Sequence, residues 1–185
     1  IYAYYRAGEG ESATDAAETF IRENPTHPRV DYAWYLKGLV DVERQPNALE
    51  RLFHADLSKR PPSNARKAFA AFKTVVEQYP KSEYAHDSLQ RMVYLRNRLA
   101  GYEVHVARYY FKRGAYVAAA QRARGAIEQY DGAPQIREAL GILIGCYERL
   151  NLPALAAQAR QVYDANYAGD TRTSQADTGK SWWKW

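Results

Sequence analysis

The chain has 185 residues, of which 46% are hydrophobic and 25% charged, a composition typical of a folded globular domain. Its formal net charge of +5 favours acidic partners without naming one. Apolar residues never continue for the ~20 positions that a membrane-spanning helix needs. The single cysteine, Cys146, excludes an intrachain disulfide and a cysteine-based zinc site.

The opening segment, IYAYYRAG, has a helical pattern but no initiator methionine and no signal sequence. We therefore expect a fragment whose N-terminus, with any targeting signal, has been removed. Glycine, proline and asparagine residues divide the rest of the chain into helices predicted at 12–23, 29–44, 63–79, 82–113, 115–130, 134–150 and 153–166. Only Gly101 interrupts 82–113, so one long helix is predicted there, with Gly101 as the point of any bend.

The last two helices have clear apolar stripes. The first contains Ile136, Leu140, Leu143, Tyr147 and Leu150, and the second contains Ala154, Leu155, Ala159, Val162 and Tyr163. Cys146 lies in the first of them, which predicts a buried structural thiol. Because no alternating apolar–polar run indicates a strand, the predicted class is all-α.

One spacing of small and aromatic residues recurs four times along the chain. Its copies are Tyr4, Gly8, Ala13, Ala17, Phe20 and Pro25; then Ala68, Phe72, Val75 and Pro80; then Tyr110, Gly114, Ala119 and Ala123; then Tyr147, Asn151, Ala156 and Arg160. This is the tetratricopeptide repeat (TPR) pattern, in which small residues let the two helices of a hairpin approach closely. Such hairpins stack into a superhelix with a concave groove.

The copies are unevenly spaced, which predicts two insertions. Ala13 and Ala68 are 55 residues apart, and Ala68 and Ala119 are 51 apart, whereas a bare repeat needs ~34. The loop 45–62 and the long helix 82–113 account for the excess. We predict a TPR solenoid over 1–167 and a disordered polar tail over 168–185. The tail ends in WWKW, for which a partner-docking plug, a contact with a bilayer interface and no role at all remain open.

Several long blocks carry a more specific resemblance. NPTHPRVDYAWYLKGL, the insertion that ends in Asp56–Arg60, ARKAFAAFKTVVEQYPKSEYAHDSLQRMVYLRNRLAGYEVHVARYY, and RGAYVAAAQR together resemble the BamD family. Its members are TPR lipoproteins of the outer-membrane β-barrel assembly machinery (the BAM complex). The resemblance covers roughly residues 1–167. It implies a five-repeat protein, of which this chain keeps the second half of the second repeat and all that follows.

The resemblance also implies partners and a location. It implies a lipid anchor upstream of Ile1 and a place on the periplasmic face of the outer membrane, whereas this chain alone should behave as a soluble fragment. The N-terminal repeats would recognise targeting segments of unfolded outer-membrane proteins. The C-terminal repeats would bind the POTRA domains of BamA and the accessory Bam lipoproteins.

Basic residues are concentrated between Arg91 and Arg124. This stretch has eight Lys and Arg residues against Glu103 alone, a balance of 8 − 1 = +7. On an unbroken helix, residues seven apart lie on one face, and the set considered for partner binding is Arg91, Arg98, His105 and Lys112, with Arg113 beside it. A solvated face and a docking surface for an acidic partner both explain it.

Arg122 matches the arginine that the family uses at its BamA contact. A planar guanidinium suits a bidentate bond to a carboxylate, and lysine would not replace it equally. The hypothesis at this stage is that Arg122→Glu weakens POTRA binding without unfolding the chain.

Two further groups are candidates for lining the groove. Phe53, Asp56 and Arg60 lie in the 45–62 insertion, which fits a recognition loop, polar packing or, least readily, a catalytic loop. Tyr32 and Tyr35 belong to an aromatic cluster that serves the core or holds apolar side chains of an extended peptide. Nucleic acid is not expected, because these rings follow the repeat spacing.

Catalysis, metals and cofactors are not expected. The four histidines are scattered without a metal-ligand spacing, and no nucleophile–base pair stands out. The rival hypotheses are another TPR peptide-binding adaptor of the cell envelope and a helical accessory domain of an enzyme such as a murein hydrolase.

Overall fold

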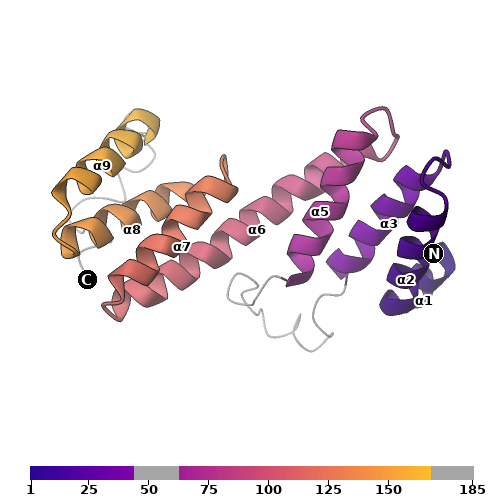
Figure 1. Ribbon diagram of the computed structural model, residues 1–185, viewed down its shortest axis with the longest axis horizontal. Helices are drawn as coiled ribbons and strands as arrows, with labels where there is room; N and C mark the ends of the chain where they lie inside the picture. The colour runs from indigo at the N-terminus through magenta and orange to yellow at the C-terminus, as the bar shows by residue number, and fades with distance from the viewer. Residues whose placement is uncertain (44–62, 168–185) are drawn as a thin grey trace, which may run out of the picture. The chain divides into compact units, whose positions relative to one another are not determined.

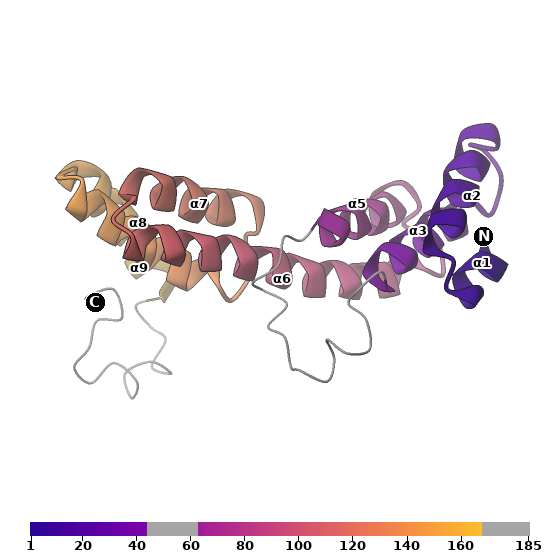
Figure 2. The ribbon, with the colours of Figure 1, turned by 90° about the horizontal axis from the view of Figure 1, so that it is seen from below.

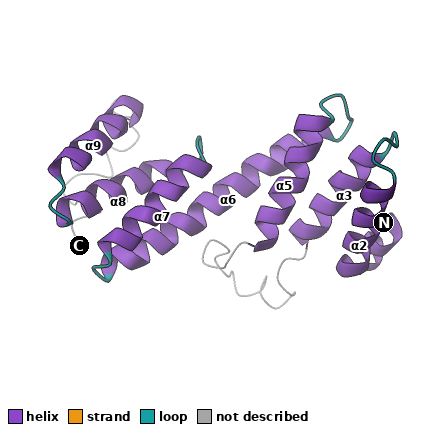
Figure 3. Cartoon of the chain, viewed as in Figure 1, coloured by secondary structure: helices purple, strands orange, loops and turns teal. Residues whose placement is uncertain are grey.

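The computed structural model describes residues 1–43 and 63–167, and every regular element within those ranges is a helix (Figures 1 and 3). The helices are α1 (Tyr2–Ala7), α2 (Gly10–Glu23), α3 (Val30–Glu43), α5 (Ser63–Gln78), α6 (Ala85–Lys112), α7 (Tyr116–Gln129), α8 (Ile136–Arg149) and α9 (Pro153–Tyr167). The all-α prediction is confirmed, and the predicted helix boundaries agree to within three residues where both are defined.

The chain forms two compact units, Ile1–Arg98 and Leu99–Trp185. In the first, α3 packs between α2 and α5; in the second, α8 packs between α7 and α9, as two views of that unit show (Figures 1 and 2). Helix α6 is continuous from Ala85 to Lys112, without a break at Gly101, so the predicted long helix is confirmed. The single solenoid over 1–167 remains a prediction.

The turn between the two helices of a hairpin repeats closely. Gly8, Gly114 and Asn151 occupy the same repeat position, and all three have a positive φ, of 77°, 75° and 56°. In each case the next amide donates to a carbonyl five residues back: Glu9 to Tyr4, Ala115 to Tyr110 and Leu152 to Tyr147, at 2.9, 3.0 and 2.9 Å. The left-handed residue lets this bond close the first helix.

The small residues of the repeat are its close-packing positions. All eight repeat residues on the second helices other than Phe20 and Arg160 are at most 2% exposed, namely Ala13, Ala17, Ala68, Phe72, Val75, Ala119, Ala123 and Ala156. The Phe72 ring fills the space beside Gly38 of α3, where an added Cβ would lie 2.6 Å from the ring. The predicted logic of small residues and a filling ring is therefore confirmed for these positions.

Ile136, Leu140, Leu143 and Tyr147 of the stripe predicted for α8 are buried, as expected, whereas the stripe predicted for α9 is not. Helix α8 is buried on nearly all sides, Gly141, Ile142 and Ile144 included, because α7 and α9 flank it. Helix α9 buries Ala156 and Ala159, but Leu155 and Val162 remain 37% and 47% exposed. The prediction for α9 was wrong because small residues, and not the larger aliphatic ones, face α8.

Candidate protein-binding surfaces

In the first unit, a cluster of rings and charges joins α3 to the start of α6. The Tyr84 ring lies 5.0 Å from that of Tyr32 and stacks on that of Tyr35 at 4.8 Å, measured between centroids. Asp87 accepts hydrogen bonds from the Tyr35 hydroxyl at 2.7 Å and from Nε of Arg91 at 2.5 Å, both on Oδ2. Tyr32 and Tyr35, predicted to belong to an aromatic cluster, therefore lie together with Arg91, predicted to belong to the basic set.

This cluster shifts the acidities of its members. Burial acts to raise the pKa of Asp87, but the hydrogen bonds from Arg91 and Tyr35 outweigh it and lower that pKa below its ordinary value. A hydrogen bond to Glu83 and then burial raise the pKa of Tyr84 to about 12. At neutral pH, Asp87 is therefore an ionised carboxylate engaged with Arg91, and the raised pKa values of Tyr35 and Tyr84 keep both phenols neutral.

A second feature of the first unit is an open depression of about 530 Å³ on α1 and α2. Its lining is Tyr4, Ser12, Asp15, Ala16, Thr19, Phe20, Glu23 and Asn24. Tyr4 is 45% exposed, so the ring on the first helix of this hairpin does not fill a core. The site combines aromatic surface with two carboxylates, which suits an extended peptide that carries apolar and basic side chains.

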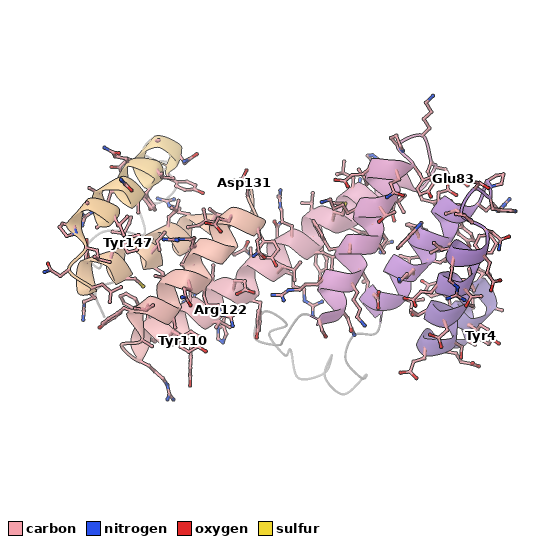
Figure 4. All side chains as sticks on the ribbon, in the orientation of Figure 1. Tyr4, Glu83, Tyr110, Arg122, Asp131 and Tyr147 are labelled. Atoms are coloured by element: carbon pink, nitrogen blue, oxygen red, sulfur yellow. The ribbon has the colours of Figure 1, made fainter. Side chains whose placement is uncertain are left out.

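In the second unit, Arg122 of α7, labelled in Figure 4, forms an ion pair with Glu103 of α6. Its Nη1 donates to Glu103 Oε2 at 3.0 Å, and the side chains are 44% and 8% exposed. The hydrogen bond to Glu103 is the main reason why the pKa of Arg122 is raised. One edge of the guanidinium is therefore held by a nearly buried carboxylate, while nearly half of the side chain faces solvent.

The other predicted basic residues have different environments. In the second unit, Arg113 lies over the Tyr109 ring at 4.7 Å, Lys112 is exposed and His105 is half-buried. In the first unit, Nε and Nη1 of Arg98 are buried and have no hydrogen-bond partner among the described residues. Arg98 is thus not a simple solvated charge. A role in partner binding for the predicted basic set, which is Arg91, Arg98, His105, Lys112 and Arg113, remains a prediction.

Phe53, Asp56, Arg60 and the WWKW tail lie outside the described residues.

Three arginine–tyrosine hydrogen bonds between helices of the second unit could not be found from the sequence. Arg124 donates to the Tyr147 hydroxyl at 2.8 Å, Arg149 to Tyr116 at 3.0 Å and Arg137 to Tyr163 at 2.9 Å. The partners are 23, 33 and 26 residues apart, so no local spacing indicates them. These three arginines, which lie on α7 and α8, therefore stabilise the packing of the helices.

The described residues also show the state of the cysteine and whether a metal site or a membrane-spanning helix is present among them. Cys146 is fully buried, and burial raises the pKa of its thiol to about 12, as predicted for a structural thiol. Residues 1–43 and 63–167 contain no group of three or more histidine, cysteine or acidic side chains that could hold a metal ion. No helix among them is both long and apolar enough to cross a bilayer.

Comparison with known proteins gives a consistent family. A family model described as outer membrane lipoprotein, YfiO, matches residues 1–162. An outer membrane protein assembly factor BamD from Neisseria gonorrhoeae is 42% identical over 187 residues, which cover 100% of this chain and 70% of its own length. Proteins of the same name from Xylella fastidiosa (strain Temecula1) and Vibrio cholerae are 40% and 34% identical, over 89% and 90% of this chain and 56% and 69% of theirs. The family model matches most of the chain, and the relatives are similar to it over at least 89% of its length. This chain therefore belongs to the YfiO family of outer membrane lipoproteins, the family of BamD.

Proposed function

We propose that this protein is a non-catalytic scaffold for the assembly of outer-membrane β-barrel proteins. The relatives are named assembly factors, which favours this function over an accessory domain of a murein hydrolase. The protein would act at the periplasmic face of the outer membrane, held there by a lipid anchor upstream of Ile1. Its work would be binding: the POTRA domains of BamA, accessory Bam lipoproteins and segments of unfolded outer-membrane proteins.

The observation that carries the POTRA contact is the Arg122–Glu103 pair. Glu103 fixes one edge of the guanidinium, which lowers the entropy that Arg122 would lose on binding a partner carboxylate. Nη1 is used in this bond, but the 44% exposure of the side chain leaves further N–H donors for an acceptor on the partner. A preoriented arginine of this kind is typical of an interface anchor.

The same pair changes how the contact has to be tested. In Arg122→Glu, the new carboxylate would face Glu103, which is only 8% exposed, so repulsion would destabilise the second unit. We therefore no longer expect Arg122→Glu to leave the fold intact, and a milder substitution is needed to test the contact. Arg122→Gln removes the charge and still offers an amide donor to Glu103.

We expect Arg122→Gln to weaken binding to the last POTRA domain of BamA about ten-fold, which is ~1.4 kcal/mol, in isothermal titration calorimetry. Arg122→Lys should give an intermediate loss, because lysine keeps the charge but not the fork. Arg160→Gln is the matched control: it breaks the exposed ion pair with Glu148 on α8 and lies outside the basic stretch. Unchanged affinity of Arg122→Gln, with native circular dichroism, would overturn the proposed contact.

Two surfaces of the first unit support binding of unfolded segments. Tyr32, Tyr35 and Tyr84 form a half-buried stack, and the depression beside Tyr4 and Phe20 offers further ring surface. Rings of this kind hold apolar side chains of an extended peptide at a low entropic cost. Tyr4→Ala, which removes a 45% exposed ring, is expected to weaken binding of a peptide from the C-terminus of an outer-membrane protein, measured by fluorescence anisotropy.

A further inference from the structure

Helix α9 has an apolar face that its neighbour α8 does not cover. Leu155 and Val162 are seven residues apart, on one side of the helix, and are 37% and 47% exposed. Leu152, just before the helix, is 41% exposed and extends the same row by three residues. Single exposed aliphatic residues are ordinary, but a row of three on the last hairpin that the structure describes is not, because an outer repeat face that nothing covers is usually polar.

The residues that follow α9 in the sequence include an apolar group of their own. Residues 168–181 read AGDTRTSQADTGKS and contain nothing larger and apolar than alanine. They are followed by Trp182, Trp183 and Trp185. Each tryptophan side chain has roughly 150–250 Å² to remove from water.

The connecting length allows the two to meet. A chain of the 15 residues from Tyr167 to Trp182 has a typical end-to-end distance of ~20–23 Å. Along a helix with a rise of ~1.5 Å per residue, Val162 lies ~8 Å and Leu155 ~18 Å from Tyr167. Such a tether gives an effective concentration in the millimolar range, so even an affinity of about 1 mM would fill half of the sites.

We propose that the segment Trp182–Trp185 binds in cis to the apolar face of α9 formed by Leu152, Leu155 and Val162. This contact gives the last described hairpin the cover that its own sequence does not provide. It is independent of the proposed role in assembly, since it involves no second protein.

Tryptophan fluorescence tests the contact directly. The remaining tryptophan, Trp34, lies in α3 of the first unit, so Trp34→Phe leaves only the tail as a reporter. In this background we expect emission to the blue of that of the free peptide GKSWWKW. We also expect an acrylamide quenching constant of about half the peptide value or less.

The decisive variant is Leu155→Gln with Val162→Gln, which should restore the emission and quenching of the free peptide. Both side chains are well exposed, so little stability is lost, and circular dichroism verifies the fold. The matched control is Ala157→Gln with Asp164→Asn, exposed positions on the opposite side of α9, which should keep the tryptophans protected.

Four results would overturn the proposal. The tail could quench like the peptide, or stay protected in Leu155→Gln with Val162→Gln. Protection could rise with protein concentration together with a dimer in analytical ultracentrifugation, which would assign the face to a second copy. It could also appear only with phosphatidylglycerol vesicles, which would assign the tryptophans to a lipid surface.

Discussion

Glycine at position 38 is required by a ring on the neighbouring helix. A Cβ there would lie 2.6 Å from the Phe72 ring, and Phe72 is fully buried, so the ring cannot move aside freely. At Gly125, also within a helix, an added Cβ would meet nothing within 4 Å. The same substitution therefore has opposite consequences at the two sites.

We predict that Gly38→Ala destabilises the protein by ~1–3 kcal/mol through overpacking. Gly125→Ala should stabilise it by ~0.5–1 kcal/mol, because alanine loses less backbone entropy in a helix. Urea unfolding followed by circular dichroism measures both. A neutral Gly38→Ala would mean that α3 and α5 separate without cost, and Gly38→Ala with Phe72→Leu should recover part of the loss.

The hydroxyl of Tyr35 is predicted to contribute to stability in a pH-dependent way. Tyr35→Phe removes one of the two hydrogen bonds accepted by Asp87 Oδ2, at a cost of ~0.5–1.5 kcal/mol at pH 7. The folded pKa of Asp87 is lowered, so the stability it contributes is present above its unfolded pKa of ~3.9 and is lost as the pH falls through the folded value.

The Tyr35→Phe variant should therefore lose less stability than the wild type between pH 7 and pH 3, in urea midpoints. Asp87 is 42% exposed, so solvent screening keeps this difference small. The control is Tyr94→Phe, which removes the hydroxyl of a 56% exposed tyrosine on α6, the helix of Asp87, and should follow the wild-type profile. A steeper pH dependence in Tyr35→Phe would show that the hydrogen bond does not lower the pKa of Asp87.

At the scale of elements, the hairpin turn determines where each first helix ends. Gly8, Gly114 and Asn151 take the left-handed conformation at the same repeat position, and the same 6→1 amide bond closes the helix in all three. The second helices also end alike: the amides of Asn24, Tyr79 and Tyr130 bond the carbonyls four residues back, those of Phe20, Val75 and Ala126. Equivalent residues thus give equivalent hydrogen bonds in different hairpins.

Gly114→Ala is predicted to cost ~1–2 kcal/mol, all of it from the backbone, because φ is +75° and no atom lies within 4 Å of the new Cβ. Gly114→Asn should cost less, since asparagine already occupies this conformation at position 151. Thermal unfolding of the two variants provides the comparison. Equal stability of Gly114→Ala and the wild type would rule out the left-handed residue as the feature that ends the helix.

At the scale of the whole molecule, positive charge is concentrated in one part of the chain. Residues 91–124 carry +7, so the remainder carries 5 − 7 = −2. Part of this charge is used internally, as in the pairs Arg91–Asp87, Arg108–Glu138 and Arg122–Glu103. An acidic partner would contact those basic side chains of residues 91–124 that remain exposed to solvent.

We predict that binding of a POTRA domain weakens as salt rises from 0.05 to about 0.5 M, because screening shortens the range of these charges. Lys112→Gln with Arg113→Gln should weaken binding at low salt and reduce its salt dependence. Lys67→Gln with Lys73→Gln removes the same charge from α5 and is the control. Binding that is insensitive to salt would mean that the basic stretch is only a solvated face.

The sequence by itself determined the helical class, the hairpin turns, the long α6 and the family. These follow from local chemistry: a glycine or asparagine at a left-handed turn, alanines where two helices touch, and blocks of residues shared with relatives. Only the tertiary structure decided which side chains meet. Tyr35 and Asp87 are 52 residues apart, and Arg122 and Glu103 are 19 apart, so the charges of a basic stretch could be counted but not paired. It also decided that α9 turns its alanines inward and leaves Leu155 and Val162 outside, because close approach to α8 requires small residues.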